Sequence, residues 1–414
     1  MNEGKGNSDI VWQQFSKNRY ACWSLWALAT LALLAIFAPL ISSNQPLVFH
    51  DGDQTIYPWF RALFNPDEPV DYVFNMALVA FLPWGIVAAL QNSGWKRRGL
   101  QLRSRVIRAL VQYAVLTAVV CGIFAIPGVK PVNPYKMRTF TEEELQSPQT
   151  RYGHYVLIPF SQIEQDVDFG YRPPLSRKPR KDWHESNDGF LHLLGTEENG
   201  RDVVTCMLYG TRLAITVGFV AVSIYLLIGC VLGAIAGYFG GLPDMLISRA
   251  IEVIMLFPAF FLILTMVAMI GPSIYIIMLV IGITSWPGIA RLIRGEVLKQ
   301  RSADYVTAAQ ALGCSHRQII WRHIIPNSLS PAFVSAPFGI AGAIITEAGL
   351  SLLGFGIRPP APSWGLLLKL GSENYAYWWL VVVPSLGIFF TVTIFNLIGN
   401  GLRDAMDPRL RATH

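Results

Sequence analysis

The sequence predicts an all-α integral membrane protein with about eight transmembrane helices. Of its 414 residues, 52% are hydrophobic and only 14% are charged, and the mean hydropathy is +0.40. Ordinary soluble domains carry about 25% charged residues, so the composition excludes that class. Long runs without Asp, Glu, Lys or Arg recur along the chain. The net charge of +6 suits basic loops on the cytoplasmic side of a membrane and requires no nucleic-acid partner.

Each predicted crossing is a segment close to the roughly 20 apolar residues that a spanning helix needs. The segments are 21–41, 72–91, 109–127, 213–237, 250–270, 273–290, 329–350 and 377–400. The fifth and sixth come from one uncharged run, 253–290, which is too long for a single crossing. The dipeptide Gly271-Pro272 favours a turn and predicts a hairpin there. No convincing small-residue cleavage site follows the first segment, which is therefore expected to remain as an anchor.

Lys and Arg in the short loops predict the orientation of the chain. Basic residues precede the first span, and the stretch WKRRGLQLRSRVIR at 95–108 follows the second. The loop at 294–328 and the C-terminal tail are also basic, so both termini are expected in the cytoplasm. The segment 128–210 is then external. It holds Lys and Arg as well, but long loops are exempt from the rule and its acidic residues balance the count.

Motifs for nucleotide binding and catalysis are absent from the sequence. There is no GxxxxGK[ST] phosphate loop, no HExxH zinc motif and no GxSxG nucleophile elbow. The histidines are scattered, and the five cysteines form no metal-spaced set. We therefore expect no catalytic residue, no metal site and no cofactor bound by this chain.

The stretch DYVTAAQALGCS at 304–315 predicts a short cytoplasmic helix between two apolar runs. One face of this helix carries residues spaced i, i+3, i+4 and i+7, namely Tyr305, Ala308, Ala309 and Leu312. Alanine lets another backbone approach closely, and the larger side chains at the two ends suit anchoring in a partner's groove. The alternative is a helical loop lying flat on the membrane surface.

The residues after this helix predict a sharp elbow and a second helix. Gly313 suits the left-handed residue that ends a helix. Ser315 has the chemistry of an N-cap, with Gln318 completing a capping box. Pro326 is expected to stop the second helix before the next span. A helix, an elbow and a helix between two spans have the shape of a lever.

The sequence resembles the permease subunits of bacterial ABC importers, specifically the oligopeptide and dipeptide branch. The stretches that carry the resemblance, in order along the chain, are LGTEENGRDVVTCMLYGTR (194–212), GYFGGLPD (237–244), DYVTAAQALGCSHRQIIWRHIIPN (304–327), ITEAGLSLLGFGIRPPAPSWG (345–365) and GLRDAMDPR (401–409). The stretches FSKNRYACWSLW, QPLVFHDG and HYVLIPF resemble more narrowly the subfamily associated with larger peptides and with peptide–nucleotide antibiotics of the microcin C kind.

This resemblance implies a transport subunit of the bacterial inner membrane that is not itself an enzyme. The implied partners are a second homologous permease subunit, two ATPase subunits that use ATP and Mg, and an extracytoplasmic peptide-binding protein. In the family the loop helix docks into a cleft on the ATPase, which implies that Ala308, Ala309 and Gly313 are coupling residues. The same region holds the other candidates for ATPase coupling, which are Tyr305, Thr307, Leu312, Ser315, Arg317, Arg322 and His323.

Thr307 departs from the family pattern, which usually has an acidic residue just before the two alanines. The departure puts in doubt any salt bridge to the ATPase at this position, but it leaves the small face and the hinge intact. Arg317, Arg322 and His323 either supply polar contacts to the ATPase instead or are ordinary positive-inside charges. Both interpretations stay open at this point.

The pair of spans at 72–127 is a second departure, because permeases of this type resemble a six-span plan with one span before the external loop. Two extra crossings preserve the orientation of everything downstream, and we expect the pair to pack at the periphery as an accessory hairpin. The predicted parts of the chain are a cytoplasmic N-terminus with the first anchor (1–41), an external loop (42–71), the extra hairpin (72–127), a long external loop (128–210), a permease core (211–402) with the coupling loop (294–328), and a cytoplasmic tail (403–414).

Charges inside spans are candidates for the translocation pathway, because they are costly in hydrocarbon. Glu252 lies near the start of the fifth span and Glu347 near the outer end of the seventh. Each either faces the cavity between two permease subunits or sits in a hydrated interface. Gly342 and Gly349 in the seventh span suggest close helix approach, which suits both permanent packing and a moving gate.

The expected function is the membrane passage of an ATP-driven peptide importer. An ion-coupled secondary transporter that works without an ATPase is the alternative, and it predicts inverted repeats and ionisable residues near the membrane midplane. We find no internal repeat. The sequence does not determine which peptide is carried.

Overall fold

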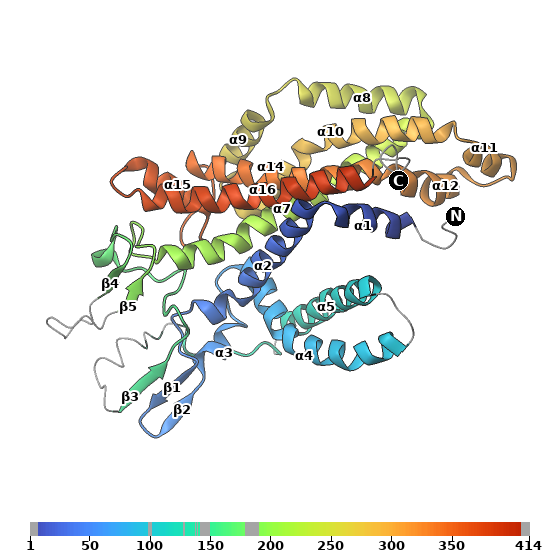
Figure 1. Cartoon of the computed structure of the whole chain (residues 1–414). Coiled ribbons are helices and arrows are strands. Elements are labelled where there is room, and N and C mark those ends of the chain that lie inside the picture. Colours follow the sequence, from blue (N-terminus) through green and yellow to red (C-terminus); the bar gives the residue numbers. More distant parts are fainter. Residues whose placement is uncertain are drawn as a thin grey trace.

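The computed structural model describes residues 7–97, 102–126, 129–136, 138, 140, 150–178 and 190–406, and most of them are helical (Figure 1). Seven helices in this part of the chain are long and apolar enough to cross a membrane, and a bent helix pair can make an eighth crossing. The seven are α2 (Arg19–Ile41), α4 (Pro69–Arg97), α5 (Leu102–Ala125), α7 (Val203–Phe239), α10 (Ile274–Arg301), α14 (Ser330–Leu352) and α16 (Trp379–Met406). The predicted helical membrane protein with about eight crossings is confirmed.

The fifth predicted span, 250–270, is interrupted rather than continuous. It consists of α8 (Gly241–Met255) and α9 (Ala259–Ile270), which meet at an angle of 83°. Pro258 stands at the break. Proline cannot donate a backbone hydrogen bond and disfavours helical geometry in the residue before it, which accounts for the interruption. The turn predicted at Gly271 is present, with φ of +113° between α9 and α10.

Helices α7 and α10 form the centre of the core, and glycines allow them to approach closely. Gly229, Gly233 and Gly237 recur every four residues along α7. A methyl group added at Gly233 would lie 2.5 Å from the carbonyl oxygen of Ala290 on α10, and at Gly237 it would lie 2.8 Å from a carbonyl oxygen of the same helix. Small residues at this spacing let two membrane helices pack backbone to backbone.

Helix α7 begins at Val203, ten residues before the predicted start of that span. The predicted external loop at 128–210 therefore ends earlier, at Asp202, whose carboxylate caps α7 by accepting a hydrogen bond from the backbone N–H of Thr205 at 2.8 Å. The prediction excluded Arg212 from the span because of its charge. The structure places Arg212 inside the helix with its side chain fully buried.

Short strands lie in the two segments that are predicted to be external loops. A three-stranded antiparallel sheet has the order β2-β1-β3 and pairs Phe49 with Gly153 and with Ile56. The strands are β1 (Val48–Asp51), β2 (Gln54–Ile56) and β3 (Arg151–His154), and a second, two-stranded sheet consists of β4 (Ser176–Lys178) and β5 (Phe190–His192). The first sheet joins the loop before α4 to the loop after α5, although the whole hairpin separates them in sequence.

Shorter helices complete the described chain. They are α1 (Asn7–Lys17), α3 (Pro58–Ala62), the 3-10 turn η1 (Val167–Phe169), α11 (Asp304–Ala311), α12 (His316–Ile319), the π-helical turn η2 (Ile320–Ile324), α13 (Ile325–Ser328) and α15 (Trp364–Glu373). Helix α1 packs beside the end of α16, where Phe15 is buried against Gly401.

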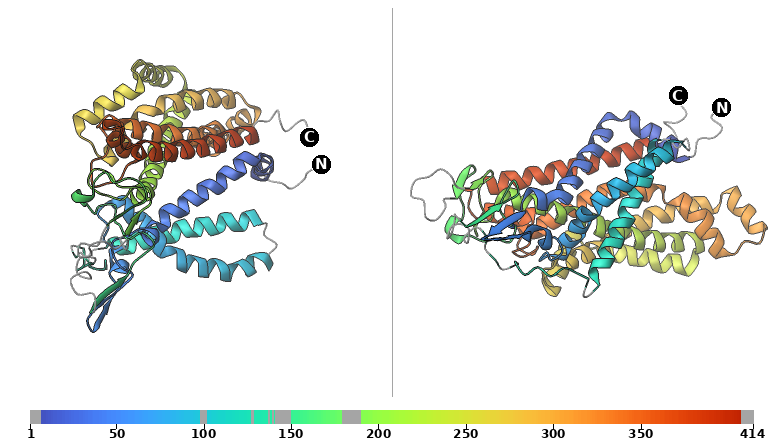
Figure 2. Two further views of the ribbon diagram at one scale, coloured as in Figure 1. Left: turned by 60° about the vertical axis from the view of Figure 1, so that its left-hand side comes forward. Right: turned by 90° about the horizontal axis from the view of Figure 1, so that it is seen from below.

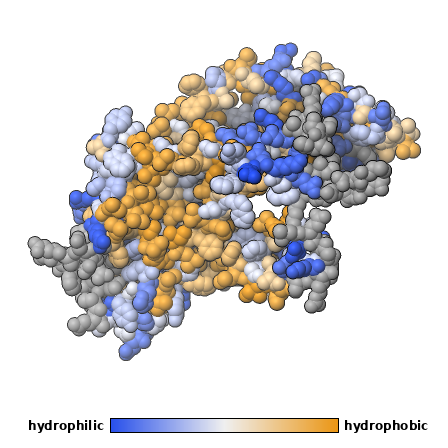
Figure 3. Space-filling view, viewed as in Figure 1, coloured by the Kyte–Doolittle hydropathy of each residue, from blue (hydrophilic) through white to orange (hydrophobic). Residues whose placement is uncertain are grey.

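The two ends of the molecule differ in what they carry. Both termini and the helices α11 and α12 lie at one end, and the strands lie at the other (Figures 1 and 2). An apolar band crosses the face between them, with hydrophilic residues towards both ends (Figure 3). This arrangement agrees with a chain that spans a membrane with its termini and the 294–328 loop on the same side.

Helices α4 and α5 form a hairpin that projects from the rest of the helices (Figures 1 and 2). Aromatic side chains join them: Trp84 donates to the carbonyl of Ala109 at 2.7 Å, and Tyr113 donates to the carbonyl of Ala77 at 2.8 Å. None of the apolar window of α5 is buried within the described chain, so the hairpin is peripheral, as expected. Its first turn, however, is held firmly against α2 and α7.

Candidate functional site

The elbow between α11 and α12 has the local geometry that the sequence predicts. Gly313 adopts φ of +79°, the left-handed region that favours glycine, and nothing lies within 4 Å of where its side chain would be. The N–H of Cys314 reaches back to the carbonyl of Ala309 at 3.1 Å, the hydrogen bond that characterises a Schellman helix end. Ser315 then accepts a hydrogen bond from the N–H of Gln318 at 3.3 Å and caps α12.

The faces of α11 differ from the expected arrangement. Ala309 is buried with Val306 against the core, whereas Ala308 and Thr307 are exposed. Tyr305 is 38% exposed and Leu312 is 85% exposed. Of the four residues predicted to share one face, Tyr305 and Ala308 on α11 and Leu312 just after it are exposed, whereas Ala309 is not. Val306 and Ala309, which are three residues apart, face the core together because a short helix that packs on a bundle buries one side of its surface.

Two side-chain contacts connect the elbow to the long helices. The hydroxyl of Tyr238, at the end of α7, lies 2.7 Å from Nδ1 of His316 on α12. The hydroxyl of Tyr305 donates to Oε1 of Gln300 on α10 at 2.7 Å. These two contacts join the elbow to the ends of α7 and α10, the two helices at the centre of the core.

The chain after α12 does not stop at Pro326, so this prediction is wrong. The backbone widens into the π-helical turn η2 and continues through α13, where Pro326 occupies the first turn. Proline removes one backbone donor and its ring clashes with the carbonyl four residues earlier, and a π-turn relieves that clash without ending the helix. Arg317 and Arg322 are exposed near this segment. The side chain of the candidate His323 lies outside the described part of the structure.

The candidate pathway residues lie in contrasting places. Glu252 is exposed on α8 and pairs with Arg249 one turn earlier, at 2.6 Å. Glu347 is 2% exposed on α14, where its Oε1 accepts hydrogen bonds from the hydroxyls of Ser351 and Ser363, each at 2.7 Å. Ser363 also caps α15, so the carboxyl group of Glu347 joins α14 to α15.

The two glycines proposed for this pathway also differ. A side chain at Gly349 would contact Phe260 of α9 at 3.3 Å, which agrees with close helix approach. Gly342 has no atom within 4 Å of that position and faces outward from this chain. Close approach at Gly342 within this subunit was therefore not found.

We expect Glu347→Gln to retain stability within about 1 kcal/mol, because the amide oxygen of glutamine can accept both serine hydroxyls. Glu347→Leu leaves two buried hydroxyls without an acceptor and should cost about 1–3 kcal/mol for each. Thermal unfolding of the purified chain in detergent measures both changes. Equal destabilisation by the two substitutions would show that the hydrogen-bond acceptor is not what matters at this position.

A buried polar cluster that the sequence interpretation missed lies at the opposite end from the elbow. The guanidinium of Arg212 on α7 donates to Asp71 Oδ1 at 2.8 Å and to Asn75 Oδ1 at 3.1 Å, both on α4, and to the carbonyl of Ala35 on α2 at 2.7 Å. Gln162, from the long loop between α5 and α7, donates to the other oxygen of Asp71 at 2.5 Å. We call Arg212, Asp71, Asn75 and Gln162 the Arg212 cluster.

The Arg212 cluster holds three helices and one loop together. Arg212 is 0% and Asp71 5% exposed, so the ion pair is enclosed by protein. Both residues border apolar runs in the sequence, at the edges of the predicted spans 72–91 and 213–237. Charges at two such edges were a signal that the helices extend past them and that the charges pair.

A second enclosed ion pair lies near the start of α7. Arg201 Nε bonds Oε1 of Glu197 at 2.9 Å, and Arg201 Nη1 donates to the carbonyl of Pro360 at 2.7 Å. Both side chains are at most 2% exposed. The pair connects the chain before α7 to the loop between α14 and α15, at the end of the core opposite the elbow.

A core of membrane-spanning helices with a capped elbow at one end and enclosed ion pairs at the other is compatible with a membrane-embedded permease. Residues 229–412 match the family described as "Binding-protein-dependent transport system inner membrane component", and residues 8–61 match "N-terminal TM domain of oligopeptide transport permease C". This chain belongs to that family of permease components of peptide ABC importers, and it is a multi-pass inner-membrane protein.

Curated relatives agree with the family. The dipeptide transport system permease protein DppC of Alkalihalophilus pseudofirmus is 41% identical over 53% of this chain and 73% of its own length. The oligopeptide transport system permease protein OppC of Haemophilus influenzae is 40% identical over 53% of this chain and 71% of its own length. The glutathione transport system permease protein GsiD of Pectobacterium atrosepticum is 37% identical over 58% and 81%.

Among solved structures, the inward-facing MetNI methionine ABC transporter is similar over 49% of this chain and 97% of that chain, with 15% identity and a TM-score of 0.41. The two family matches leave residues 62–228 between them. That interval contains the α4–α5 hairpin, most of the external sheets and Arg212.

Proposed function

We propose that this chain is the passage-forming subunit of an ATP-driven peptide importer and that its elbow receives the force generated by a separate ATPase subunit. The observation that supports the proposal best is the outward surface made by Tyr305 and Ala308 of α11 and by Leu312, which follows that helix. Leu312 is 85% exposed at the end of the molecule that carries both termini. An apolar side chain that protrudes from a capped helix suits insertion into a protein groove.

The mechanism follows from the contacts of the elbow. ATP and Mg are bound by two ATPase subunits, and one of them grips α11. Its movement reaches α7 through the contact between Tyr238 and His316 and reaches α10 through Tyr305. The spans then re-pack against a second permease subunit between inward-open and outward-open states. A peptide-binding protein outside the membrane delivers the cargo.

Peptide cargo is supported by the relatives, whose names include dipeptide, oligopeptide and glutathione transport. The resemblance to the branch for larger peptides and peptide–nucleotide antibiotics stays a prediction. Uptake by cells that carry the whole system, with defined peptides of increasing length, distinguishes these cargoes. Uptake by the isolated chain without ATP would instead favour a secondary transporter.

Loss of the ATPase from the complex is the expected result of Leu312→Asp. The substitution removes an apolar side chain that contributes about 2 kcal/mol to binding and places a carboxylate in an apolar groove. The affinity of the ATPase for the chain should fall about thirtyfold. The measurement is the amount of ATPase that co-purifies with the tagged chain. Leu157→Asp is the matched control, because Leu157 is 83% exposed in the external loop. Undiminished ATPase recovery with Leu312→Asp would contradict docking at this surface.

We propose that both termini and the elbow lie on the cytoplasmic side of the membrane. A single cysteine at Lys96, near the end of α4, should resist a membrane-impermeant thiol reagent in intact spheroplasts, whereas a cysteine at Asp53 beside β2 should react. Both positions are exposed in the structure. The background for this labelling is a variant with the five native cysteines replaced. Labelling of position 96 from outside would overturn the topology.

A further inference from the structure

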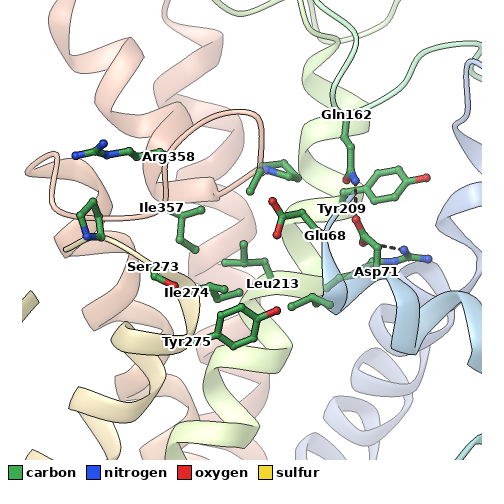
Figure 4. Close-up of a pocket in the computed structure, with 15 residues that line it drawn as sticks. Glu68, Asp71, Gln162, Tyr209, Leu213, Ser273, Ile274, Tyr275, Ile357 and Arg358 are labelled. Atoms are coloured by element: carbon green, nitrogen blue, oxygen red, sulfur yellow. Dashed lines mark hydrogen bonds and ion pairs between the residues drawn. The ribbon is translucent and has the colours of Figure 1, made fainter. Parts of the chain in front are cut away.

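A cavity of about 200 Å³ lies at the external end of the core, beside the Arg212 cluster (Figure 4). It lies between the start of α4, the helix α7, the turn that joins α9 to α10, and the loop that follows α14. Its volume corresponds to about six or seven water molecules, enough for a group of amino-acid size. Four aliphatic residues, Val70, Leu213, Ile274 and Ile357, contribute to its lining.

One of the charged groups that line this cavity has no ion-pair partner among the described residues. Asp71 is neutralised by Arg212, and the nearby Asp67 pairs with Lys136 at 2.5 Å. Glu68 lines the cavity, and its carboxylate has no hydrogen bond or ion pair to any residue that the structure describes. The guanidinium of Arg358 extends away from Glu68 at the rim (Figure 4). Glu68 is therefore a carboxylate in the cavity lining that Arg358 does not pair with.

A buried acceptor accompanies this charge. Gln162 is 7% exposed and lines the cavity, and its Nε2 is fixed by donation to Asp71 at 2.5 Å. Its Oε1 is buried and has no partner within the described residues. Because a carboxylate only accepts hydrogen bonds, the amide must present its nitrogen to Asp71, which leaves the oxygen free to accept. Buried polar atoms usually have a partner, so this oxygen points to a missing donor.

Burial supports the same interpretation. Partial burial and the neighbouring carboxylates Asp71 and Asp67 raise the pKa of Glu68. A cation with several N–H groups would relieve that repulsion and satisfy the orphan oxygen of Gln162 together. The hydroxyls of Tyr275 and Ser273 in the lining offer further acceptors. No group of three or more His, Cys, Asp or Glu suited to a metal ion occurs in the described chain.

We propose that this cavity is a binding site for a primary ammonium group, with Glu68 as its counter-ion and Gln162 Oε1 as an acceptor. An ammonium group has three donors, and the aliphatic lining accommodates the carbon chain that carries it. Two sources share this chemistry, the amino terminus of a peptide in transit and the ethanolamine headgroup of a phospholipid. The first source rests on the proposed import function.

Thermal unfolding of the purified full-length chain in detergent tests the site directly. Propylammonium should raise the Tm of the wild type, because a ligand of the native state stabilises it. The Glu68→Gln variant should lose this shift. Glu198→Gln should keep it, because Glu198 is an exposed glutamate at the same end but outside the cavity lining.

Tetramethylammonium, which has the charge without N–H groups, should give no shift. The absence of a shift in the wild type, an equal shift in Glu68→Gln, or an equal response to tetramethylammonium would overturn the site.

Two further experiments distinguish the peptide amino terminus from the lipid headgroup as the source of the ammonium group. If the headgroup occupies the site, the propylammonium shift should vanish in nanodiscs of phosphatidylethanolamine and persist in phosphatidylglycerol. If the peptide occupies it, uptake by the complete importer should favour a free over an acetylated amino terminus, and Glu68→Gln should abolish that preference. The absence of both effects would overturn a role in cargo or headgroup binding. A chain that binds propylammonium but supports no ATP-dependent peptide uptake would contradict the proposed function and leave the site intact.

Discussion

Asp71→Leu is expected to destabilise the protein by about 3–5 kcal/mol, because it leaves the guanidinium of Arg212 buried without a counter-ion. Arg212 is completely enclosed and Asp71 supplies its only carboxylate among the described contacts. The remaining hydrogen-bond partners of Arg212, which are Asn75 and the carbonyls of Ala35 and Ile36, are neutral acceptors. Unfolding of the purified chain in mixed micelles, with the fraction unfolded followed against denaturing detergent, measures the loss.

The double variant Asp71→Leu with Arg212→Met separates charge from packing. Replacement of both members of a buried ion pair by apolar residues of similar size is often neutral, so we expect it to recover most of the lost stability. Asp71→Leu alone also removes the acceptor for Gln162, and Gln162→Leu measures that smaller contribution. A double variant that is no more stable than Asp71→Leu would show that the buried charge is not the main cause.

The expected effect of Asp71→Leu implies that the stability of the core depends on the α4–α5 hairpin. Asp71 and Asn75 belong to α4, and Arg212 belongs to the core helix α7. The hairpin is peripheral along most of its length, yet its first turn supplies the charge that the core requires. Deleting the hairpin should therefore destabilise the core unless Arg212 is replaced as well.

Gly313→Pro is expected to abolish uptake while leaving membrane insertion normal. Proline fixes φ near −65°, whereas Gly313 adopts +79° at the elbow, so the turn between α11 and α12 cannot form. Gly313→Ala should give a partial loss, since the left-handed conformation costs a residue with a Cβ about 1–2 kcal/mol. Peptide uptake normalised to the amount of chain in the membrane is the measurement.

Gly313→Asn is the matched control for the backbone explanation. Asparagine visits the left-handed region more readily than alanine, and no atom lies within 4 Å of the added side chain's first carbon. We therefore expect more uptake from Asn than from Ala at this position. If all three substitutions preserved uptake, the elbow would not be needed for coupling. Ala309→Glu is a poor probe by comparison, because Ala309 is buried and a charge there would disturb the core.

Local features of the candidate site were predictable because they depend on neighbouring residues. The left-handed Gly313 and the cap at Ser315 follow from residue type and spacing within a few positions. Which face of α11 points outward was not predictable in the same way. Tyr305, Ala308, Ala309 and Leu312 share one stripe in a helical projection, but the bundle beneath α11 determines that Ala309 turns inward.

The sequence by itself determined the class of the protein and the number of its crossings, because the length of an apolar run is set by the thickness of the membrane. Only the tertiary structure decided that Arg212 pairs with Asp71, 141 residues away, and that Glu68 and Gln162 meet at one cavity. Each membrane span can be recognised from its own apolar residues, without reference to the rest of the chain. An ion pair or a cavity instead requires two distant segments to be brought together. That meeting depends on how the helices pack, and no local pattern encodes it.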